Sequence, residues 1–418
     1  MSTTTTKSTP KIALIGAGPA SLTLASLLKC HDIPFTIYEA ASSLRHAGGT
    51  LDLHPTTGQA ALKEAGLWDA FVKHARPESD VMKLVDIGGE VCWDENGADK
   101  QEVGESEEEK FAGRPEIDRA ALMKILVESL EEGSIKFGKK LNEVVPSKTE
   151  EKKFNLVFAD GKEEGFDLVI GGDGAWSKVR NLLSDTKPHY SGISLIEVWC
   201  NDVKSNPWLR NYVGNGSCFS FGEGCAILSQ RQGDGSQRTY ACLRVPEDFI
   251  ETCSIDWNDK DAARKEFMER HFSHAGKDLK RVVMESTDYL IPRTLYELPV
   301  GFTWESRPGV TLIGDSAHLM TPFAGVGVNV GMTDSLVLAH EIVAACKGKK
   351  SLDEALQAYE KEMFPRAARY AQKTAKNKKG HFTEGGSKHM ADRIRAHYEE
   401  ARKEPNVQVD RAEGVSSG

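Results

Sequence analysis

After a polar start, the chain opens with a short apolar run that ends in glycines. This run, KIALIGAG at 11–18, predicts a buried strand. The residues that follow, PASLTLASLLKCHDI, space their leucines as in a helix packed on a sheet. FTIYEA, which comes after Pro34, predicts a second strand. Strand, helix and strand in this order predict a right-handed parallel β–α–β unit.

The pattern then alternates between helical and strand segments up to residue 187. TTGQAALKEAGLWDAFVKH predicts a helix that Gly66 interrupts or caps, and EIDRAALMKILVESLEEG predicts another with Asp118 as its N-cap. VMKLVDIGGEVCWDENG and FNLVFADGKEEG predict two hairpins, and the second leads into the apolar strand FDLVIGG. KQEVGESEEEK is expected to form an acidic, solvent-exposed loop.

From 188 to about 300 the chain becomes rich in strands. The segments ISLIEVW, CAILSQR and RTYACLRV are separated by glycine-rich turns and predict an antiparallel sheet. VTLIGD returns to the pattern of a parallel strand, and a helix is expected from about 326. LDEALQAYEKEMFPRAARYAQKTAK predicts a further helix with a kink or break at Pro365, because proline has no backbone N–H. The charged remainder is expected to be frayed.

Composition narrows the choice of partners. A net charge of −9 and a pI near 5.8 argue against nucleic acid or an anionic membrane, both of which require a basic face. No apolar run approaches a membrane span, and MSTTTTKSTPK lacks a hydrophobic signal-peptide core. The eight cysteines are dispersed without a CxxC pair, so we expect a reduced, cytoplasmic protein. Neither His54 nor His318 has a second ligand at metal spacing, so no metal site is predicted.

The turn after the first strand carries the pattern of a dinucleotide site. GAGPAS matches G-x-G-x-x-G except that Ser21 takes the third position, where a small side chain is needed for packing. Gly16 permits the tight turn, and Gly18 allows the backbone to approach a pyrophosphate at the helix N-terminus. Glu39 ends the second strand, where a carboxylate accepts hydrogen bonds from a ribose diol. The motif by itself does not separate FAD from NAD.

Two later segments also place polar residues and glycines after a strand. In DLVIGGDGAWSKVR, Asp173 and Gly174 follow the strand, and a helix carrying Ser177 and Arg180 is expected after them; an ordinary Asp-Gly turn is the alternative. TLIGDSAHLMTPFAGVGVNVG groups Asp315, Ser316 and His318 before several glycines. This group admits a serine hydrolase site or a backbone shaped to lie against a ligand. Members of a catalytic triad meet in space rather than within four residues, which favours the second interpretation.

Three such sites in this order resemble the class A flavin-dependent monooxygenases, which have the para-hydroxybenzoate hydroxylase fold. The resemblance extends to about residue 375. GGTLDLH (48–54), PEIDRAAL (115–122), SKVR (177–180) and GDSAHLMTPFAGVGVN are most similar to the tetracycline-inactivating monooxygenases of the TetX type. The chain departs from that group at Glu39-Ala40, where the group has Glu-Arg, and in the residues that hold tetracycline.

The resemblance implies an α/β fold with a Rossmann-like FAD-binding domain, an inserted antiparallel-sheet substrate domain and a C-terminal helix. The expected FAD-binding domain comprises 11–80, 106–187 and 301–350, and the substrate-binding domain comprises 81–105 and 188–300. A helical segment is expected at 351–395, with tails at 1–10 and 396–418.

The resemblance also implies the site residues. Those implied to bind FAD or the nicotinamide cofactor are Gly16, Gly18, Pro19, Ala20, Ser21, Glu39, Arg45, Gly49, Asp52, Arg119, Asp173, Asp315, Pro322, Gly325, Gly327 and Val328. Arg45 would contact the nicotinamide cofactor, and Pro322 and Gly325 would lie at the flavin edge. Candidates for lining the substrate pocket are Phe219, Phe221, Gln230, Arg238, Arg293 and Phe323.

The chemistry implied is that NADPH reduces FAD, which then forms a C4a-hydroperoxide with O₂. The distal oxygen goes to an electron-rich carbon of a phenol or enol. No catalytic side chain is assigned, because the cofactor carries the reaction. The expected substrate is an aromatic or polyketide small molecule, tetracycline-like in the nearest case. The protein is expected to be a monomer without stable membrane insertion. An FAD dehydrogenase or oxidase, a binding protein without turnover, and a serine hydrolase are the alternatives.

Overall fold

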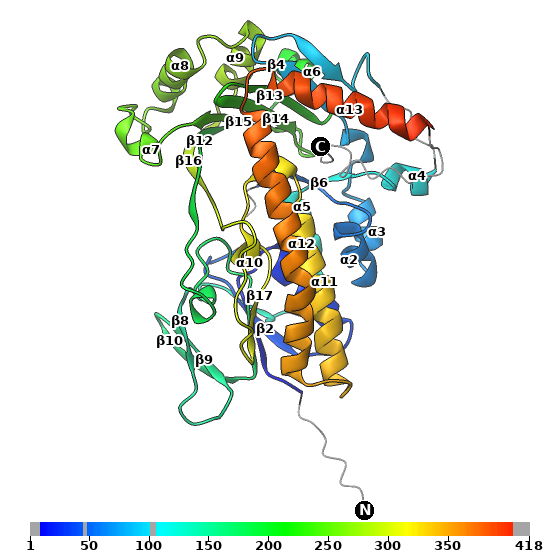
Figure 1. Ribbon diagram of the computed structural model, residues 1–418, viewed down its shortest axis with the longest axis vertical. Coiled ribbons are helices and arrows are strands. Elements are labelled where there is room, and N and C mark those ends of the chain that lie inside the picture. Colours follow the sequence, from blue (N-terminus) through cyan, green and yellow to red (C-terminus); the bar gives the residue numbers. More distant parts are fainter. Residues whose placement is uncertain (1–8, 45–47, 101–105, 404–418) are drawn as a thin grey trace, which may run out of the picture.

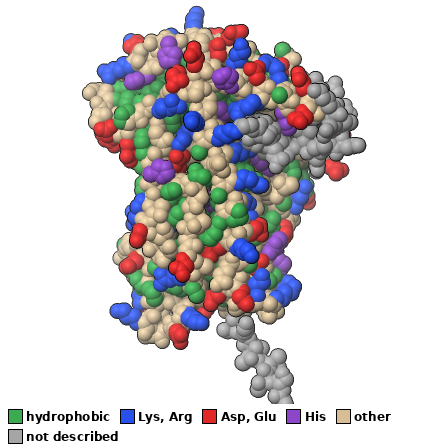
Figure 2. Space-filling model, viewed as in Figure 1, with side chains coloured by type: hydrophobic (Ala, Val, Ile, Leu, Met, Phe, Trp, Pro, Cys, Tyr) green, Lys and Arg blue, Asp and Glu red, His purple; other side chains and the backbone are tan. Residues whose placement is uncertain are grey.

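The protein is elongated and contains two main sheets that lie one above the other along its long axis (Figure 1). The computed structural model describes residues 9–44, 48–100 and 106–403. None of the helices in these ranges is long and apolar enough to cross a membrane. On the face viewed in Figure 2, lysines and arginines are interspersed with aspartates and glutamates.

The first sheet is parallel, with the strand order β17-β11-β1-β2-β7. Its strands are β1 (Ile12–Ile15), β2 (Phe35–Tyr38), β7 (Ile135–Lys136), β11 (Leu168–Gly171) and β17 (Val310–Leu312). The central strands β1 and β11 are buried along their whole length. Because both faces of a parallel sheet are covered, such strands form unbroken apolar runs, and this is why the sequence revealed them. The predicted parallel pairing of β1 and β2 is confirmed.

Helices and two small sheets complete this part of the molecule. α1 packs between α11 and α5, and α11 also contacts α2. The helices are α1 (Pro19–Lys29), α2 (Gly58–Glu64), α3 (Trp68–Val72), α5 (Arg119–Glu128), α10 (Asp315–His318) and α11 (Gly327–Cys346). The small antiparallel sheets are β3 (Thr50–Asp52) with β6 (Glu116–Asp118), and β8 (Leu141–Pro146), β9 (Phe154–Phe158) and β10 (Gly161–Phe166). Gly66 lies between α2 and α3, as predicted.

The second sheet has seven strands in the order β16-β12-β15-β14-β13-β4-β5. They are β4 (Met82–Asp86), β5 (Val91–Asp94), β12 (His189–Cys200), β13 (Ser217–Gly222), β14 (Cys225–Arg231), β15 (Gln237–Arg244) and β16 (Tyr289–Glu297). The pairing is antiparallel as predicted, except that β4 and β13 run parallel. The strands from the hairpin at 81–97 therefore extend the sheet formed by residues beyond 188.

The two faces of this sheet pack against different partners. Side chains such as Ile196, Val198 and Ile227 form one core with the outer helices. These helices are α6 (Pro207–Val213), α7 (Phe249–Thr252), α8 (Lys260–His271) and α9 (Lys277–Met284). Side chains that alternate with them, among them Leu195 and Phe221, face the interior, where they meet the C-terminal helices. Successive side chains along a strand point to opposite faces of the sheet. One face therefore packs against the outer helices, and the other is available to line a site.

Two long helices connect the sheets. α12 (Leu352–His381) packs along α11 and reaches the second sheet, and α13 (Gly386–Lys403) crosses that sheet at the top of Figure 1. The sequence predicted a kink or a break at Pro365; a break is wrong, because α12 continues through this residue. Proline removes one backbone hydrogen bond, but Tyr359, Met363 and Ala367 are buried on both sides of it, and their packing holds the helix together.

Four other local predictions need correction. Asp118 stands at the N-cap of α5 but does not cap it, because its carboxylate accepts hydrogen bonds from Arg76 and from the N–H of Gly233. Within the expected acidic loop, Glu107–Phe111 form α4, which a capping box between Ser106 and Glu109 starts. The helix predicted to begin in SKVR is only the 3₁₀ turn Arg180–Leu182. The C-terminal segment that was expected to be frayed contains the helix α13. Pro77–Ser79 and Pro322–Ala324 are further 3₁₀ turns.

Candidate active site

The glycine-rich turn between β1 and α1 has the geometry that the sequence predicted. Gly16 has φ +90°, and a Cβ there would lie 2.5 Å from the carbonyl oxygen of Gly172. Gly18 has φ −78°, and a Cβ there would meet no atom of the described residues within 4 Å. Ser21 is buried, and a Cβ on Gly172 would collide with its hydroxyl group. Gly16 and Ser21, at the first and third positions of the motif, are therefore fixed by packing, whereas Gly18 at the second position faces open space.

Glu39 closes this turn from the end of β2. Its carboxylate accepts hydrogen bonds from the N–H of Ala17 and of Ala41, both at 2.8 Å. Gly16 in turn donates to the carbonyl of Tyr38 at 2.8 Å. Glu39 lines the main cavity and is half-buried. A carboxylate has about four acceptor positions, so it can receive further donors from a ligand.

The ends of β11 and β17 are tied together by side chains. The Asp173 carboxylate accepts hydrogen bonds from the Ser177 hydroxyl at 2.5 Å and from the N–H of Lys178 at 2.7 Å. Ser316 accepts from the N–H of Gly174 at 2.7 Å and contacts Asp173 at 3.2 Å. The buried Arg180 donates to the carbonyl of Ser316 at 2.9 Å. Asp173 and Ser316 therefore hold the two loops in place.

His318 belongs to a different buried group. Asp334 on α11, which is 0% exposed, accepts from His318 Nε2 at 2.6 Å, from Arg366 at 3.0 Å and from the N–H of Gly314 at 2.9 Å. Burial opposes both charges, but their attraction prevails, so the pKa of His318 is raised and that of Asp334 is lowered. Because His318 faces Asp334 while Ser316 faces Asp173, the serine hydrolase hypothesis has no nucleophile–base pair here.

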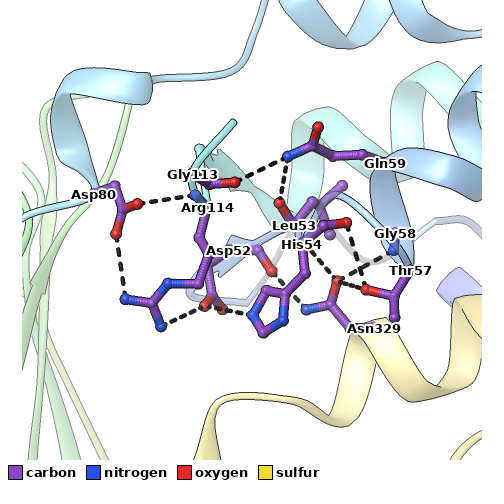
Figure 3. Close-up of polar contacts among 10 residues, drawn as sticks. All are labelled: Asp52, Leu53, His54, Thr57, Gly58, Gln59, Asp80, Gly113, Arg114 and Asn329. Carbon is purple, nitrogen blue, oxygen red and sulfur yellow. Dashed lines mark hydrogen bonds and ion pairs between the residues drawn. The ribbon is translucent and has the colours of Figure 1, made fainter. Parts of the chain in front are cut away.

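A polar network joins β3 to the start of α11 (Figure 3). Asn329 donates to the carbonyl of Asp52 at 2.7 Å, and its amide oxygen accepts from the N–H of His54 at 2.9 Å. The Asp52 carboxylate lies 3.2 Å from His54 and 3.6 Å from Arg114, which also contacts Asp80. Burial raises the pKa of Asp52, but the His54 hydrogen bond and Arg114 outweigh it, so that pKa is lowered. This network fixes the strand that carries GGTLDLH against the helix that follows Gly325.

One cavity of about 1180 Å³ runs from the glycine-rich turn to the inner face of the second sheet. The predicted cofactor residues that line it are Gly16, Gly18, Pro19, Glu39, Gly49, Asp52, Arg119, Asp173, Pro322 and Gly325. Ala20, Ser21, Asp315, Gly327 and Val328 are not among the residues that line it. Arg45 lies outside the described residues. The six predicted substrate residues, Phe219, Phe221, Gln230, Arg238, Arg293 and Phe323, all line the cavity.

The sheet face in this cavity changes from apolar to charged along its strands. Phe221, Ala226, Cys242 and Leu195 form one row across β13, β14, β15 and β12. Phe219, Leu228, Tyr240 and Glu197 form the next, and Ser217, Gln230, Arg238 and Trp199 form the third. One end of the cavity wall is therefore hydrophobic, and the other carries charge and hydrogen-bonding groups.

A glutamate that sequence reasoning missed organises the polar end. Glu197 is 4% exposed and accepts hydrogen bonds from Arg293 Nε at 2.6 Å and from Trp199 Nε1 at 2.7 Å. Arg238 is 8% exposed, and its guanidinium lies 3.9 Å from the centre of the Trp199 ring. Among the described residues, Arg238 Nε and Nη1 have no hydrogen-bond partner, although Nη1 is 3.7 Å from Glu197. The sequence signal was an acidic residue at an inward position of a strand, in ISLIEVW.

Other cavity residues missed from the sequence come from the second sheet and the C-terminal helices. Among them are Trp199, Tyr240, Tyr289, Asn377, His381 and Met390. Period-two alternation pointed to Trp199 and Tyr240, because they share a face with Glu197 and Arg238. No local pattern indicated that α12 and α13 would reach this cavity, since that depends on the path of a helix 30 residues long.

The residues present fit a flavin dinucleotide. Gly18 leaves open space at the N-terminus of α1, where Pro19 contributes no N–H and no side chain caps the helix. Such a terminus with free N–H groups and a positive dipole end favours a pyrophosphate. The cavity also exceeds the roughly 300–1000 Å³ of a pocket for a single small ligand, so it has room for a dinucleotide beside a substrate.

Comparison with known proteins agrees with this geometry. The sequence profile of the FAD binding domain family matches residues 9–374. Monooxygenase asqM of Emericella nidulans is 31% identical, with 85% of this chain and 92% of that protein covered. Among solved structures, Klebsiella pneumoniae HpxO complexed with FAD and uric acid has a TM-score of 0.73 at 21% identity, covering 98% of this chain and 97% of that one. Tetracycline destructase Tet(55) has a TM-score of 0.67 at 17% identity, covering 90% and 91%, which is a likeness of fold alone.

Proposed function

The chain belongs to the FAD-binding-domain family and is an FAD-dependent monooxygenase, and we propose that it uses NADPH and O₂ to oxygenate an aromatic or polycyclic phenol or enol. The observation that carries this proposal is the single continuous cavity. Its walls include both the glycine-rich turn of the parallel sheet and the aromatic face of the second sheet. A dinucleotide and a small molecule bound in one cavity are in reach of each other, as direct oxygen transfer requires.

The protein's own groups have limited tasks in this reaction. Bound FAD would supply the redox chemistry, by taking a hydride from NADPH and delivering one oxygen atom of O₂ to the substrate, while the other oxygen atom leaves as water. The turn at Gly16 and Gly18 would hold the pyrophosphate, and Glu39 the ribose of the adenosine part. Asp52 and Gly325 would border the flavin: a Cβ on Gly325 would lie 3.9 Å from Asp52 Oδ1, so β3 and the start of α11 approach closely there. The buried network around Asn329 keeps these elements in register.

The inner face of the second sheet supports a flat, largely apolar substrate. Phe219 and Tyr240 place aromatic side chains in this wall, and burial raises the pKa of Tyr240 to about 12, so its hydroxyl remains a neutral hydrogen-bonding group. At the polar end, Arg238 Nε and Nη1, which have no hydrogen-bond partner among the described residues, would donate to a carbonyl or anionic oxygen of the substrate. HpxO binds uric acid, another flat molecule rich in oxygen atoms. Tetracyclines have the same features, and the fold likeness to Tet(55) makes them the first class to try.

The test begins with the purified protein loaded with FAD. NADPH oxidation is followed in air with a panel of tetracyclines, polycyclic phenols and hydroxylated benzoates, and products are analysed by mass spectrometry. The expected result is substrate-stimulated NADPH oxidation and a product heavier by one oxygen atom. Faster oxidation with NADH than with NADPH would refute the choice of cofactor. A product lighter by two hydrogens would favour the dehydrogenase or oxidase alternative, and no turnover across the panel would overturn the proposed substrate class.

Other expectations from the sequence stay predictions. These are the domain boundaries, the monomeric state and the cytoplasmic location. The parallel sheet and the seven-stranded sheet have separate hydrophobic clusters, which supports two domains. Size-exclusion chromatography with light scattering of the FAD-loaded protein measures its molecular mass in solution and so tests the monomeric state.

A further inference from the structure

His381 is a buried side chain in the wall of the cavity. It ends α12, is 3% exposed and lies among the cavity-lining residues. Its ring stacks on Phe221 with 4.4 Å between ring centres. In the part of the chain that the structure describes, neither Nδ1 nor Nε2 has a hydrogen-bond partner. Buried polar groups are nearly always paired, so an unpaired one in a ligand cavity indicates a partner that comes with the ligand.

The surroundings of His381 keep its ring neutral. Burial, and secondarily the Arg393 guanidinium on α13, lower its pKa to about 4. A neutral imidazole has one donor nitrogen and one acceptor nitrogen, so it suits a neutral polar group better than a carboxylate. A hydroxyl group can donate or accept and therefore pairs with either tautomer.

His381 also stands at the apolar end of the sheet face. Phe221, on which it stacks, is four residues along β13 from Ser217, which shares a row with Arg238; this corresponds to roughly 13 Å along the strand. Asn377, one helical turn before His381, already donates to the carbonyl of Phe323 at 3.1 Å. That bond ties this end of α12 to the Pro322–Ala324 turn, which the family resemblance assigns to the flavin edge.

We propose that His381 hydrogen-bonds the hydroxyl group that activates the substrate ring and thereby selects hydroxylated substrates. The inference rests on the proposed function, since oxygen transfer to an aromatic carbon requires an electron-donating group. An imidazole nitrogen that accepts a hydrogen bond from the hydroxyl group increases electron density on the oxygen and on the ring. The substrate would then span the cavity, with its hydroxyl at His381 and a carbonyl or anionic oxygen toward Arg238.

Binding of a matched pair of probes tests the inference without turnover. The FAD-loaded protein is titrated with 2-naphthol and with 2-methoxynaphthalene, and binding is followed by the change in flavin absorbance. The original protein is expected to prefer 2-naphthol by about two- to tenfold, the effect of one neutral hydrogen bond. His381→Leu is expected to abolish this preference and His381→Asn to retain part of it. The exposed His389→Leu serves as control and is expected to behave like the original protein. An equal affinity of the original protein for both probes, no binding of either, or a preference that His381→Leu retains would overturn the inference.

A second measurement needs no ligand. Replacing this buried imidazole with leucine is expected to raise the urea midpoint of the FAD-free protein, because the two ring nitrogens, which are unpaired within the described ranges, are then removed. A lower midpoint would mean that His381 has a structural role, and would contradict the inference. Neither readout depends on NADPH oxidation, so failure of the proposed reaction would be recognised separately.

Discussion

Two glycines of the same turn are expected to respond in opposite ways to a single added methyl group. Gly18 has φ −78° and ψ 172°, a conformation open to any residue, and a Cβ there would meet no described atom within 4 Å. Gly18→Ala should therefore leave the fold of the FAD-free protein intact. It should even stabilise that protein by ~0.4–1 kcal/mol, because alanine restricts the unfolded chain. The methyl group would, however, occupy the space assigned to the pyrophosphate.

The loss of FAD affinity follows from this overlap. Forcing one methyl group into an occupied space costs about 1–3 kcal/mol, which corresponds to a roughly five- to 150-fold higher dissociation constant. At Gly16 the same change acts on the fold itself. Its φ is +90° and the new Cβ would lie 2.5 Å from the Gly172 carbonyl, so the strained backbone and the clash together should cost about 2–5 kcal/mol of the unfolding free energy. Gly66→Ala serves as the control for backbone strain without a clash, since its φ is +68° and no described atom lies within 4 Å of the added Cβ. The loss of unfolding free energy in this variant should come from the strained backbone alone.

Both effects are measured on the same FAD-free preparations. Titration with FAD, followed by flavin fluorescence, gives the dissociation constant, and urea unfolding followed by circular dichroism gives the midpoint. The expected order of midpoints is Gly18→Ala at or above the original protein, then Gly66→Ala, then Gly16→Ala. If Gly18→Ala binds FAD as tightly as the original protein, the assignment of this space to the cofactor is wrong. If it unfolds as early as Gly16→Ala, the reasoning from the free space at Gly18 is wrong.

Three further changes test the contacts around the cavity. Asp334→Asn should lower the unfolding free energy by ~3–5 kcal/mol, because it leaves buried cations uncompensated, whereas the exposed Asp185→Asn should not change the urea midpoint. The pKa of Asp334 is lowered and that of His318 is raised, so this pair contributes its full stabilisation between about pH 4 and 6.5. The stabilisation is lost as the pH falls through the pKa of Asp334 or rises through the pKa of His318. The difference in unfolding free energy between Asp334→Asn and Asp185→Asn should therefore shrink at pH 9. Glu39→Gln should weaken FAD binding about tenfold or more, measured by fluorescence titration, since two backbone N–H groups lose a charged acceptor. Ser387→Ala should cost about 2 kcal/mol by urea unfolding, because the hydroxyl joins Val85 O to Phe221 N; an unchanged midpoint would mean that α13 is not anchored there.

The parts of the fold that could be predicted are those whose signal is local. β1, β11 and β17 are recognisable because strands covered on both faces are continuously apolar. The hairpins and Gly66 follow from turn chemistry. The continuity of α12 through Pro365 was not predictable, because it depends on how the buried face of α12 packs in the folded protein, including against α11. The parallel pairing of β4 with β13 was likewise hidden, since more than a hundred residues separate the two strands.

The candidate site divides in the same manner. The turn at Gly16 and Gly18 is a short motif with a known geometry, so its residues were identified without the structure. Phe219, Arg238 and Arg293 were named as candidates because the family resemblance places the substrate pocket between the flavin and the antiparallel sheet. His381 was not, because a histidine near the end of a long helix has no distinguishing pattern. Its significance comes only from Phe221 beneath it and from the absence, among the described residues, of any hydrogen-bond partner.

The sequence alone determined the fold class, the dinucleotide turn and the family resemblance. Each depends on residues that are close along the chain or on the order of short motifs. The tertiary structure decided the role of the segment that groups Asp315, Ser316 and His318. Ser316 is directed to Asp173 and His318 to Asp334, so both side chains hold loops in place. Ser316 and His318 have different partners although they are close in sequence, because side chains at the turn after a strand point in different directions. The partner of each side chain belongs to an element that only the folded chain brings near it.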